Sequence, residues 1–415
     1  MVRPHRGTWA QQALRTLPPL LFLFALAAAC HAQNRDVLCN LGTGNFTAQF
    51  RTGVAVRVGA ARNGGLAERL CQAALSWGNQ NLVIADQAAQ VDVDAFGSDL
   101  GLGVPVVAFQ IKKSANTCCV EYRIYSLRQP PKLLQTITGG DFFSAADTDL
   151  DGAVEIWTDD AASVDGFDHL VVGQLDFSPT VVLRYTRGQL FDVSPEFQPY
   201  FDEQIATVKA KLDAQDLRDF QASDGILPAP VPFSAEALRR RDRLQGVKVK
   251  VLEIVWAYLY SGRDDEAWRA LAELWPPGDA ARMRAAILQA RGRGIRAQVH
   301  GVSTGASARH KNSARIYDAL TETQKGKAEV IPPEPILLRR AAPLGPEDQD
   351  LATSELQLIL VVDAAGKVRS AQAAADARRF DAGMKSATAN WKFIPAFKGT
   401  QAVASRSGFI VSLTR

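Results

Sequence analysis

The stretch LQLILVVDAAGKVRSAQ at residues 356–372 decides how the end of this 415-residue chain folds. Apolar and polar side chains alternate along Glu355–Val362, which predicts a β-strand with one buried face. The turn Asp363-Ala364-Ala365-Gly366 follows, and Lys367–Ala373 then predicts a second strand that returns beside the first. The C-terminal part therefore begins with a β-hairpin.

The next stretch, FDAGMKSATANWKFIPAFKGTQAV at residues 380–403, continues this pattern. Its apolar residues recur at helical spacing over Phe380–Trp391, which predicts an amphipathic helix. A turn at Lys398-Gly399-Thr400 and a last strand at Val403–Leu413 complete the order β-β-α-β. We therefore expect residues 336–415 to form an α+β domain, in which one helix packs on a small antiparallel sheet.

Residues 335–415 resemble the TonB C-terminal domain family. The most specific part of the resemblance is Trp391, Phe393, Pro395 and Ala396, at the end of the helix. The resemblance implies a protein-interaction module that captures a partner by β-strand addition at its sheet edge. It also implies envelope proteins as partners, including an outer-membrane receptor or a peptide segment of one.

The first 32 residues are typical of a secretory signal peptide. Arg3, Arg6 and Arg15 form a basic start, and Leu17–Ala29 is a short apolar run. Cleavage before Gln33 would release the protein into the periplasm or cell envelope. Two alternatives stay open, namely lipidation at Cys30 and an uncleaved inner-membrane anchor. An anchor would favour a TonB-type energy transducer for outer-membrane transport, although folded domains stand here in place of that family's Pro-rich spacer.

Residues 33–195 predict an all-β domain, because short apolar runs alternate with Gly, Pro, Asp and Asn. Two segments echo each other 55 residues apart, VDVDAFGSD from Val91 and ADTDLDGAVEIW from Ala146. This period is typical of propeller blades and resembles FG-GAP repeats. About 160 residues are too few for a closed propeller, so we expect an open assembly of sheets.

The second segment carries a candidate Ca²⁺ site. Carboxylates at alternating positions around a glycine are the ligands that a hard cation requires, and we assign Asp147, Asp149, Asp151 and Glu155 to this role. Asp92, Asp94 and Asp99 form a poorer copy, because Phe96 replaces the third ligand, and we interpret that copy as structural.

Four cysteines follow the signal segment, and an oxidising compartment favours disulfides among them. Four cysteines allow three pairings. A bond between the adjacent Cys118 and Cys119 would be strained, so we expect each to pair with Cys39 or Cys71.

Residues 196–300 predict an α-helical region. Candidate helices run from Gln198 to Gln221, from Ser234 to Tyr260, from Asp264 to Trp275 and from Asp279 to Arg293. Residues 247–277 resemble a single tetratricopeptide-like hairpin. Residues 301–335 are rich in Ser, Lys and Gly, and we expect a partly helical linker.

The charges are unevenly distributed. Residues 33–232 carry 15 Lys and Arg against 25 Asp and Glu, whereas residues 233–340 carry 20 against 12. The basic charges are spread over amphipathic helices without interleaved stacking aromatics, which argues against a nucleic-acid partner.

The motifs also argue against an enzyme. Gly301-Val302-Ser303-Thr304-Gly305 matches a hydrolase elbow, but the only later histidine is His310 in the linker, and the required triad order is missing. No HExxH, P-loop or dinucleotide motif occurs. The preferred hypothesis is a non-enzymatic envelope interaction module. A secreted calcium-dependent binding or hydrolytic protein is a further alternative.

Overall fold

The computed structural model describes residues 2–3, 37–61, 70–115, 118–170, 177–228, 234–304, 314–319, 330–338, 355–374, 380 and 382–412. These residues form several β-sheets and seven α-helices, without a closed barrel. The general prediction of a chain that combines β-rich and helical parts is confirmed. In the described ranges no helix is long and apolar enough to cross a membrane. Apart from Val2 and Arg3, the predicted signal segment lies outside them.

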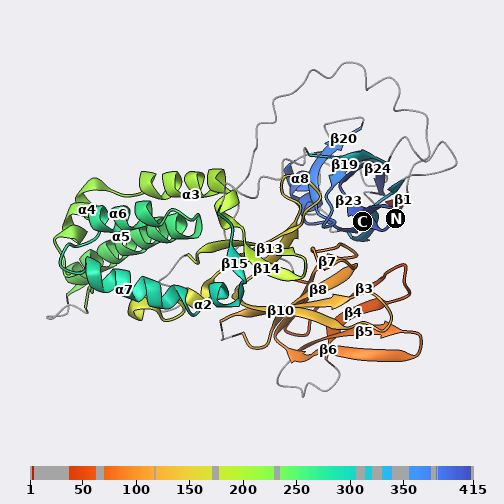
Figure 1. The fold of residues 1–415 in the computed structure, drawn as a ribbon, viewed down its shortest axis with the longest axis horizontal. Helices are drawn as coiled ribbons and strands as arrows, with labels where there is room; N and C mark the ends of the chain where they lie inside the picture. Colours follow the sequence, from red (N-terminus) through yellow and green to blue (C-terminus); the bar gives the residue numbers. More distant parts are fainter. Residues whose placement is uncertain are drawn as a thin grey trace.

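Three four-stranded antiparallel meanders follow one another in the β-rich part (Figure 1). The first contains β3 (Phe46–Gln49), β4 (Ala55–Ala60), β5 (Cys71–Trp77) and β6 (Gln80–Ala88). The second contains β7 (Gln90–Phe96), β8 (Val106–Lys112), β9 (Val120–Ser126) and β10 (Leu133–Gly140). The third contains β11 (Phe143–Ala146), β12 (Glu155–Asp159), β13 (Thr180–Thr186) and β14 (Gln189–Asp192). Two short strands extend these sheets, since β2 (Cys39–Asn40) pairs with β7 and β15 (Gly301–Val302) pairs in parallel with β14.

The sheets form because their side chains alternate between core and solvent. In β4, Val56 and Val58 are buried while Arg57 between them is exposed. Such alternation places one face of a strand in the core, where each fully buried aliphatic side chain contributes about 1.5–3 kcal/mol. The first two meanders share one core of this kind.

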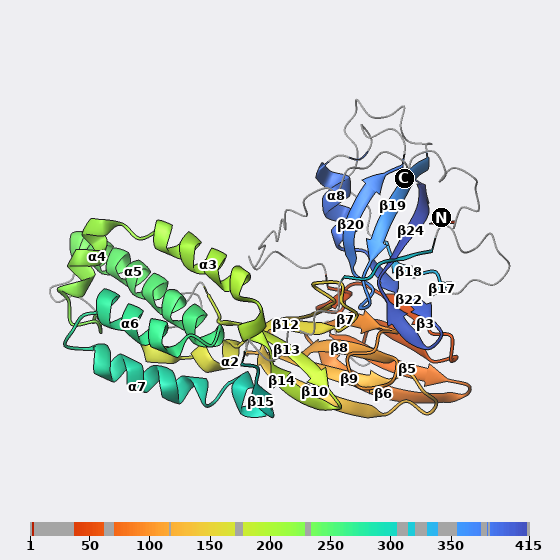
Figure 2. The same ribbon diagram turned by 45° about the horizontal axis from the view of Figure 1, so that its top comes forward.

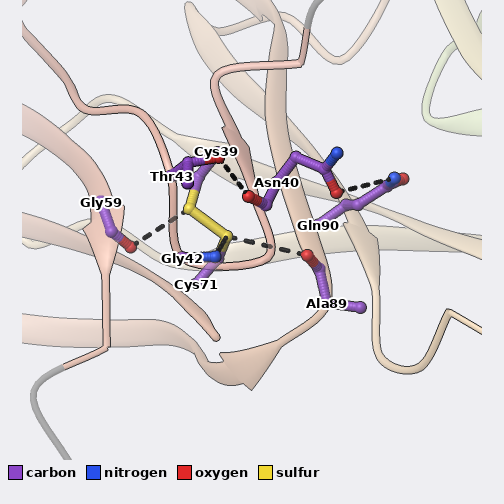
Figure 3. Close-up of a disulfide and its surroundings, with 8 residues drawn as sticks. All are labelled: Cys39, Asn40, Gly42, Thr43, Gly59, Cys71, Ala89 and Gln90. Atoms are coloured by element: carbon purple, nitrogen blue, oxygen red, sulfur yellow. Dashed lines mark hydrogen bonds between the residues drawn. A yellow bond between two sulfur atoms is a disulfide. The ribbon is translucent and has the colours of Figure 1, made fainter. Parts of the chain in front are cut away.

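One disulfide ties β2 to the first meander. Cys39 bonds to Cys71 on β5, and both residues are buried (Figure 3). The carbonyl oxygens of Gly59 and Ala89 lie 3.5 and 3.8 Å from the two sulfur atoms. Cys118 bonds to its neighbour Cys119. The predicted pairing of Cys118 and Cys119 with Cys39 and Cys71 is therefore wrong, because β2 pairs with β7 beside the start of β5 and brings Cys39 to Cys71.

The helical part contains five α-helices, which group at one end of the molecule (Figure 1). They are α3 (Gln198–Ala210), α4 (Ala214–Gln221), α5 (Ala235–Tyr260), α6 (Asp264–Leu274) and α7 (Ala280–Arg291). The single helix predicted over 198–221 is two helices. α3 ends at Ala210, and Asp213 caps the start of α4, since its carboxylate accepts hydrogen bonds from the backbone of Gln215 and Asp216.

A continuous core joins the third meander to the helices. Ile156 and Leu183 of the sheet and Trp256 of α5 belong to one buried cluster. Asp160, at the start of the short helix α2 (Ala161–Val164), accepts a hydrogen bond from Tyr260 of α5. The change from β to α near residue 195 is therefore not a boundary between separate cores.

The C-terminal part has the predicted hairpin, helix and final strand. β19 (Glu355–Val362) lies between β20 (Val368–Ala373) and β24 (Ser405–Ser412) in one sheet, and α8 (Ala382–Ala389) contacts β20 (Figure 2). The helix is shorter than the predicted 380–391. Short strands follow it, namely β21 (Lys392–Ile394), β22 (Ala396–Lys398) and β23 (Gln401–Val403).

The described parts of residues 301–335 contain strands, whereas residues 305–313 and 320–329 of the predicted partly helical linker lie outside the described residues. Besides β15, they hold β16 (Tyr317–Asp318), β17 (Val330–Ile331) and the start of β18 (Glu334–Leu337). β16 pairs with β24, β17 with β22 and β18 with β21. Backbone pairing with the C-terminal sheets supplies the hydrogen bonds that a helix would otherwise supply.

Candidate functional site

The predicted cation loop connects β11 to β12. Carboxylate oxygens of Asp147, Asp149 and Asp151 lie within 4.8 Å of one another. Asp147 is fully buried, Asp151 is half-buried and Asp149 is exposed. The structure thus brings three of the four predicted ligands together at one end of the third meander.

Hydrogen bonds from the backbone to these carboxylates shape the loop. The N–H of Gly152 donates to Asp147 Oδ2 at 3.1 Å, and the N–H of Ala153 donates to Asp151 Oδ1 at 2.7 Å. Gly152 has a φ of +91°, which favours glycine at this position. The loop therefore turns sharply enough to direct alternate side chains toward one point.

One oxygen in the loop lacks a partner. Asp147 Oδ1 is buried and receives no hydrogen bond from the described residues. Burial, together with the nearby carboxylates of Asp363 and Glu155, raises the pKa of Asp147 to about 8. A buried carboxylate without a donor is costly, and a hard divalent cation would compensate it. The residues present therefore fit a Ca²⁺ ion.

Glu155, the fourth predicted ligand, is held differently. Its Oε1 accepts hydrogen bonds from Arg184, with Nη2 at 2.8 Å, and its Oε2 accepts one from the Thr148 N–H at 3.1 Å. Burial raises the pKa of Glu155 to about 7, although Arg184 opposes this shift. Arg184 also contacts Glu196 at 2.8 Å. Glu155 thus belongs to a buried ion-pair network behind the loop and lies outside the group of three aspartates.

The second acidic segment, with Asp92, Asp94 and Asp99, lies mostly within a strand and not in a loop between two strands. Asp92 and Asp94 lie within β7, whereas Asp99 follows it and accepts hydrogen bonds from the Leu102 and Gly103 N–H groups. The two echoing segments are therefore not structurally equivalent. Among the described residues, this copy forms no convergent group of carboxylates.

Asp92 and Asp94 instead hold the C-terminal part of the chain. Lys392 Nζ lies 3.0 Å from Asp92, and Lys367 Nζ lies 2.6 Å from Asp94. Tyr122 also donates a hydrogen bond to Asp94 at 2.8 Å. A cavity of about 250 Å³ adjoins these pairs, and its two lysines are engaged by its two aspartates. Sequence reasoning missed this interface, because no local pattern links residues so distant in the chain.

An apolar contact completes the same interface. Ile394 and Phe397 of the C-terminal part are buried in the core of the first two meanders. The ring of Phe397 lies 6.2 Å from that of Phe50, and the Arg51 guanidinium lies 3.8 Å above the Phe397 ring. The C-terminal part is thus docked by both apolar and charged side chains.

The hydrolase-like motif is not assembled in the described residues. Gly301 and Val302 form β15, and the Ser303 N–H donates to the Asp192 carbonyl at 2.8 Å. Gly305 and His310 lie outside the described residues. Cys118 and Cys119 lie near Asp141, and the three could otherwise form a metal site. Because the two cysteines are bonded to each other, they offer no thiolate ligands to a metal ion.

The edge of the C-terminal sheet is the second candidate site. β24 pairs with β19 on its inner side, and short segments from distant parts of the chain pair with its outer side. β16 lies parallel to Ser405 and Arg406, while β1 (Val2–Arg3) lies antiparallel to Ile410 and Val411. In the described residues, the strand edge between these two segments carries no paired strand.

Comparison with known proteins identifies no relative, since no family model, curated protein or solved structure matches the chain.

Proposed function

We propose that this chain is an exported, non-enzymatic interaction module of the cell envelope, in which the outer edge of β24 captures an extended segment of a partner protein. The observation that carries the proposal is that this edge already pairs with two short strands from elsewhere in the chain. Strand addition of this kind derives affinity from main-chain hydrogen bonds.

The backbone hydrogen bonds identify which residues would contact the partner. The N–H groups of Tyr317 and Ala319 donate to the carbonyls of Ala404, just before β24, and Arg406 within it, so these two residues direct their backbone groups outward. Backbone groups alternate in direction along a strand, which places those of Gly408 and Ile410 on the same outer side. A partner strand would bind there, in the place that Val2 and Arg3 occupy beside Val411 and Ile410.

The resemblance to the TonB C-terminal domain supports the same proposal. Trp391 and Phe393, which carry the resemblance, are buried against Met384 and Phe409 beneath the sheet. These contacts make β24 part of a packed sheet, so the strand presents a rigid edge. A rigid edge loses little entropy when a partner strand is added.

Site-specific photocrosslinking tests this proposal in envelope preparations of the native host. A photoreactive residue at Ile410 should capture a defined partner segment, whereas one at Val83, which is 60% exposed on β6, should not. A synthetic peptide of the captured segment should then bind the chain that begins at Gln33, in which β1 no longer occupies this edge. Ile410→Pro removes an outward N–H and should weaken that binding by about tenfold or more. Equal affinity of the variant and the parent chain would contradict strand addition at this edge.

A second candidate function is Ca²⁺-dependent binding, favoured by the buried Asp147 Oδ1 that lacks a donor. Calorimetric titration of the full chain with CaCl₂ should show binding that Asp147→Asn abolishes. Asp99→Asn is the matched control, because the Asp99 carboxylate, like that of Asp147, accepts hydrogen bonds from the backbone but lies outside the group of three aspartates. Absence of binding heat, with no shift in the melting temperature, would rule out the site.

A further inference from the structure

The cation loop lies directly against the C-terminal part of the chain. The N–H of Asp147 donates to Asp363 Oδ2 at 3.2 Å, and Arg369 Nη2 donates to the Thr148 carbonyl at 3.3 Å. Asp363 begins the turn between β19 and β20, where its Oδ1 accepts hydrogen bonds from the Ala365 and Lys367 N–H groups at 2.9 Å. Asp147 and Asp363 are both fully buried.

This contact differs from the rest of the interface in its charges. The Lys392–Asp92 and Lys367–Asp94 contacts pair opposite charges across the interface. The Asp147–Asp363 contact instead places the Asp363 carboxylate beside the backbone of the acidic loop, and among the described residues no lysine or arginine pairs with Asp147 across it. Lys367 and Arg369 offset part of the Asp363 charge. Like charges in a buried contact oppose docking unless a positive charge compensates them.

We propose that a divalent cation held by Asp147, Asp149 and Asp151 acts as an interdomain latch that fastens the β19–β20 turn, through Asp363, to the β-rich part. This inference rests on the second candidate function and extends it from binding to regulation.

The coupling follows from charge and linkage. Asp363 adds a carboxylate beside the loop only when the C-terminal part is docked, so a cation binds more tightly to the docked state. Because coupling between two equilibria is reciprocal, the bound cation favours docking by the same factor. Without a cation, the negative charge of the three loop aspartates opposes burial of the Asp363 carboxylate beside them. Cation availability would therefore control how firmly the C-terminal sheet is held.

Hydrogen exchange of the full chain tests the latch at residues that lie outside the cation loop. CaCl₂ should slow exchange of the Ala365, Gly366 and Lys367 amides relative to EGTA. Asp363→Asn should weaken Ca²⁺ binding about five- to tenfold in calorimetry and should remove this Ca²⁺-dependent protection. Asp363→Ser is a second variant, since serine also accepts turn hydrogen bonds but carries no charge. Asp99→Asn should behave like the parent chain.

A distance measurement provides an independent readout. Spin labels at Val83 of β6 and Lys385 of α8, both exposed, should give a narrower distance distribution with Ca²⁺ than with EGTA. If Ca²⁺ binds while the exchange of residues 365–367 and the label distances stay unchanged, the latch is overturned and the cation site stands. If Ca²⁺ does not bind, both are overturned.

Discussion

Lys392 Nζ lies 3.0 Å from both carboxylate oxygens of Asp92, although the two residues are 300 positions apart in the sequence. Both side chains are largely buried, with 14% and 16% of their surface exposed. The pair joins β21, in the C-terminal part of the chain, to β7 of the second meander. The two parts are therefore held by specific side-chain contacts, which makes their association testable by mutation.

Replacing Lys392 by methionine should lower the free energy of unfolding by about 2–3 kcal/mol, because it leaves Asp92 partly buried without its cation. Lys385→Met on the exposed face of α8 is the control and should cost less than about 0.5 kcal/mol. Urea denaturation of both variants measures the difference. If both variants lost the same free energy of unfolding, the Lys392–Asp92 contact would not contribute to stability.

The metal-free protein should become less stable as the pH rises from 5.5 to 8. Burial raises the pKa of Asp147 to about 8 and that of Asp363 to about 6, so the folded state retains protons that the unfolded state has released. Stability that depends on bound protons is lost as the pH rises through the folded pKa. The melting temperature in EGTA should record this fall, and Asp147→Asn should reduce its slope. A melting temperature independent of pH would contradict the raised pKa values of Asp147 and Asp363 in the folded protein.

Calcium should reverse this trend. Cation ligands must be deprotonated, so Ca²⁺ affinity should increase with pH, and the rise in melting temperature on adding CaCl₂ should be larger at pH 8 than at pH 5.5. The comparison uses the same buffers with NaCl at equal ionic strength as the control. A stabilisation of equal size at both pH values would show that Asp147 is not titrating at the site.

Removing the Cys39–Cys71 disulfide should destabilise the protein by about 3–4 kcal/mol. The bond closes a loop across a sequence separation of 32 residues, and its loss increases the conformational entropy of the unfolded chain. Replacing both cysteines by alanine and measuring urea unfolding tests this value. The double alanine variant of Cys118 and Cys119 is the control, because a bond between neighbours closes no long loop, and its effect should be clearly smaller.

Tyr260→Phe should cost about 1–2 kcal/mol by removing the hydroxyl that donates to the buried Asp160 carboxylate. Asp160 would keep its hydrogen bond from the Ile295 N–H at 2.8 Å, which limits the loss. Tyr258→Phe is a matched control, because the Tyr258 hydroxyl contacts Lys209 in an exposed position. If both variants lost a similarly small free energy of unfolding, the Tyr260–Asp160 hydrogen bond would not stabilise the packing of α5 against the third meander.

The sequence alone determined the local elements and the cation loop. The alternation of apolar and polar side chains predicted the hairpin of β19 and β20. The capping residue Ser234 and the helical spacing of apolar residues predicted α5. The spacing of Asp147, Asp149 and Asp151 predicted that their carboxylates lie close together. These features depend on neighbours within about ten residues, whose geometry follows from backbone periods of 2 and 3.6 residues.

Only the tertiary structure decided how these elements meet. It placed Cys39 beside Cys71, Asp363 beside Asp147 and Lys392 beside Asp92, and it engaged Glu155 with Arg184. Each of these contacts joins different strands or turns, so it depends on the order of strands in the sheets and on how the sheets pack. Side-chain burial, which sets the charge balance at the cation loop, arises only when those distant surfaces exclude water together.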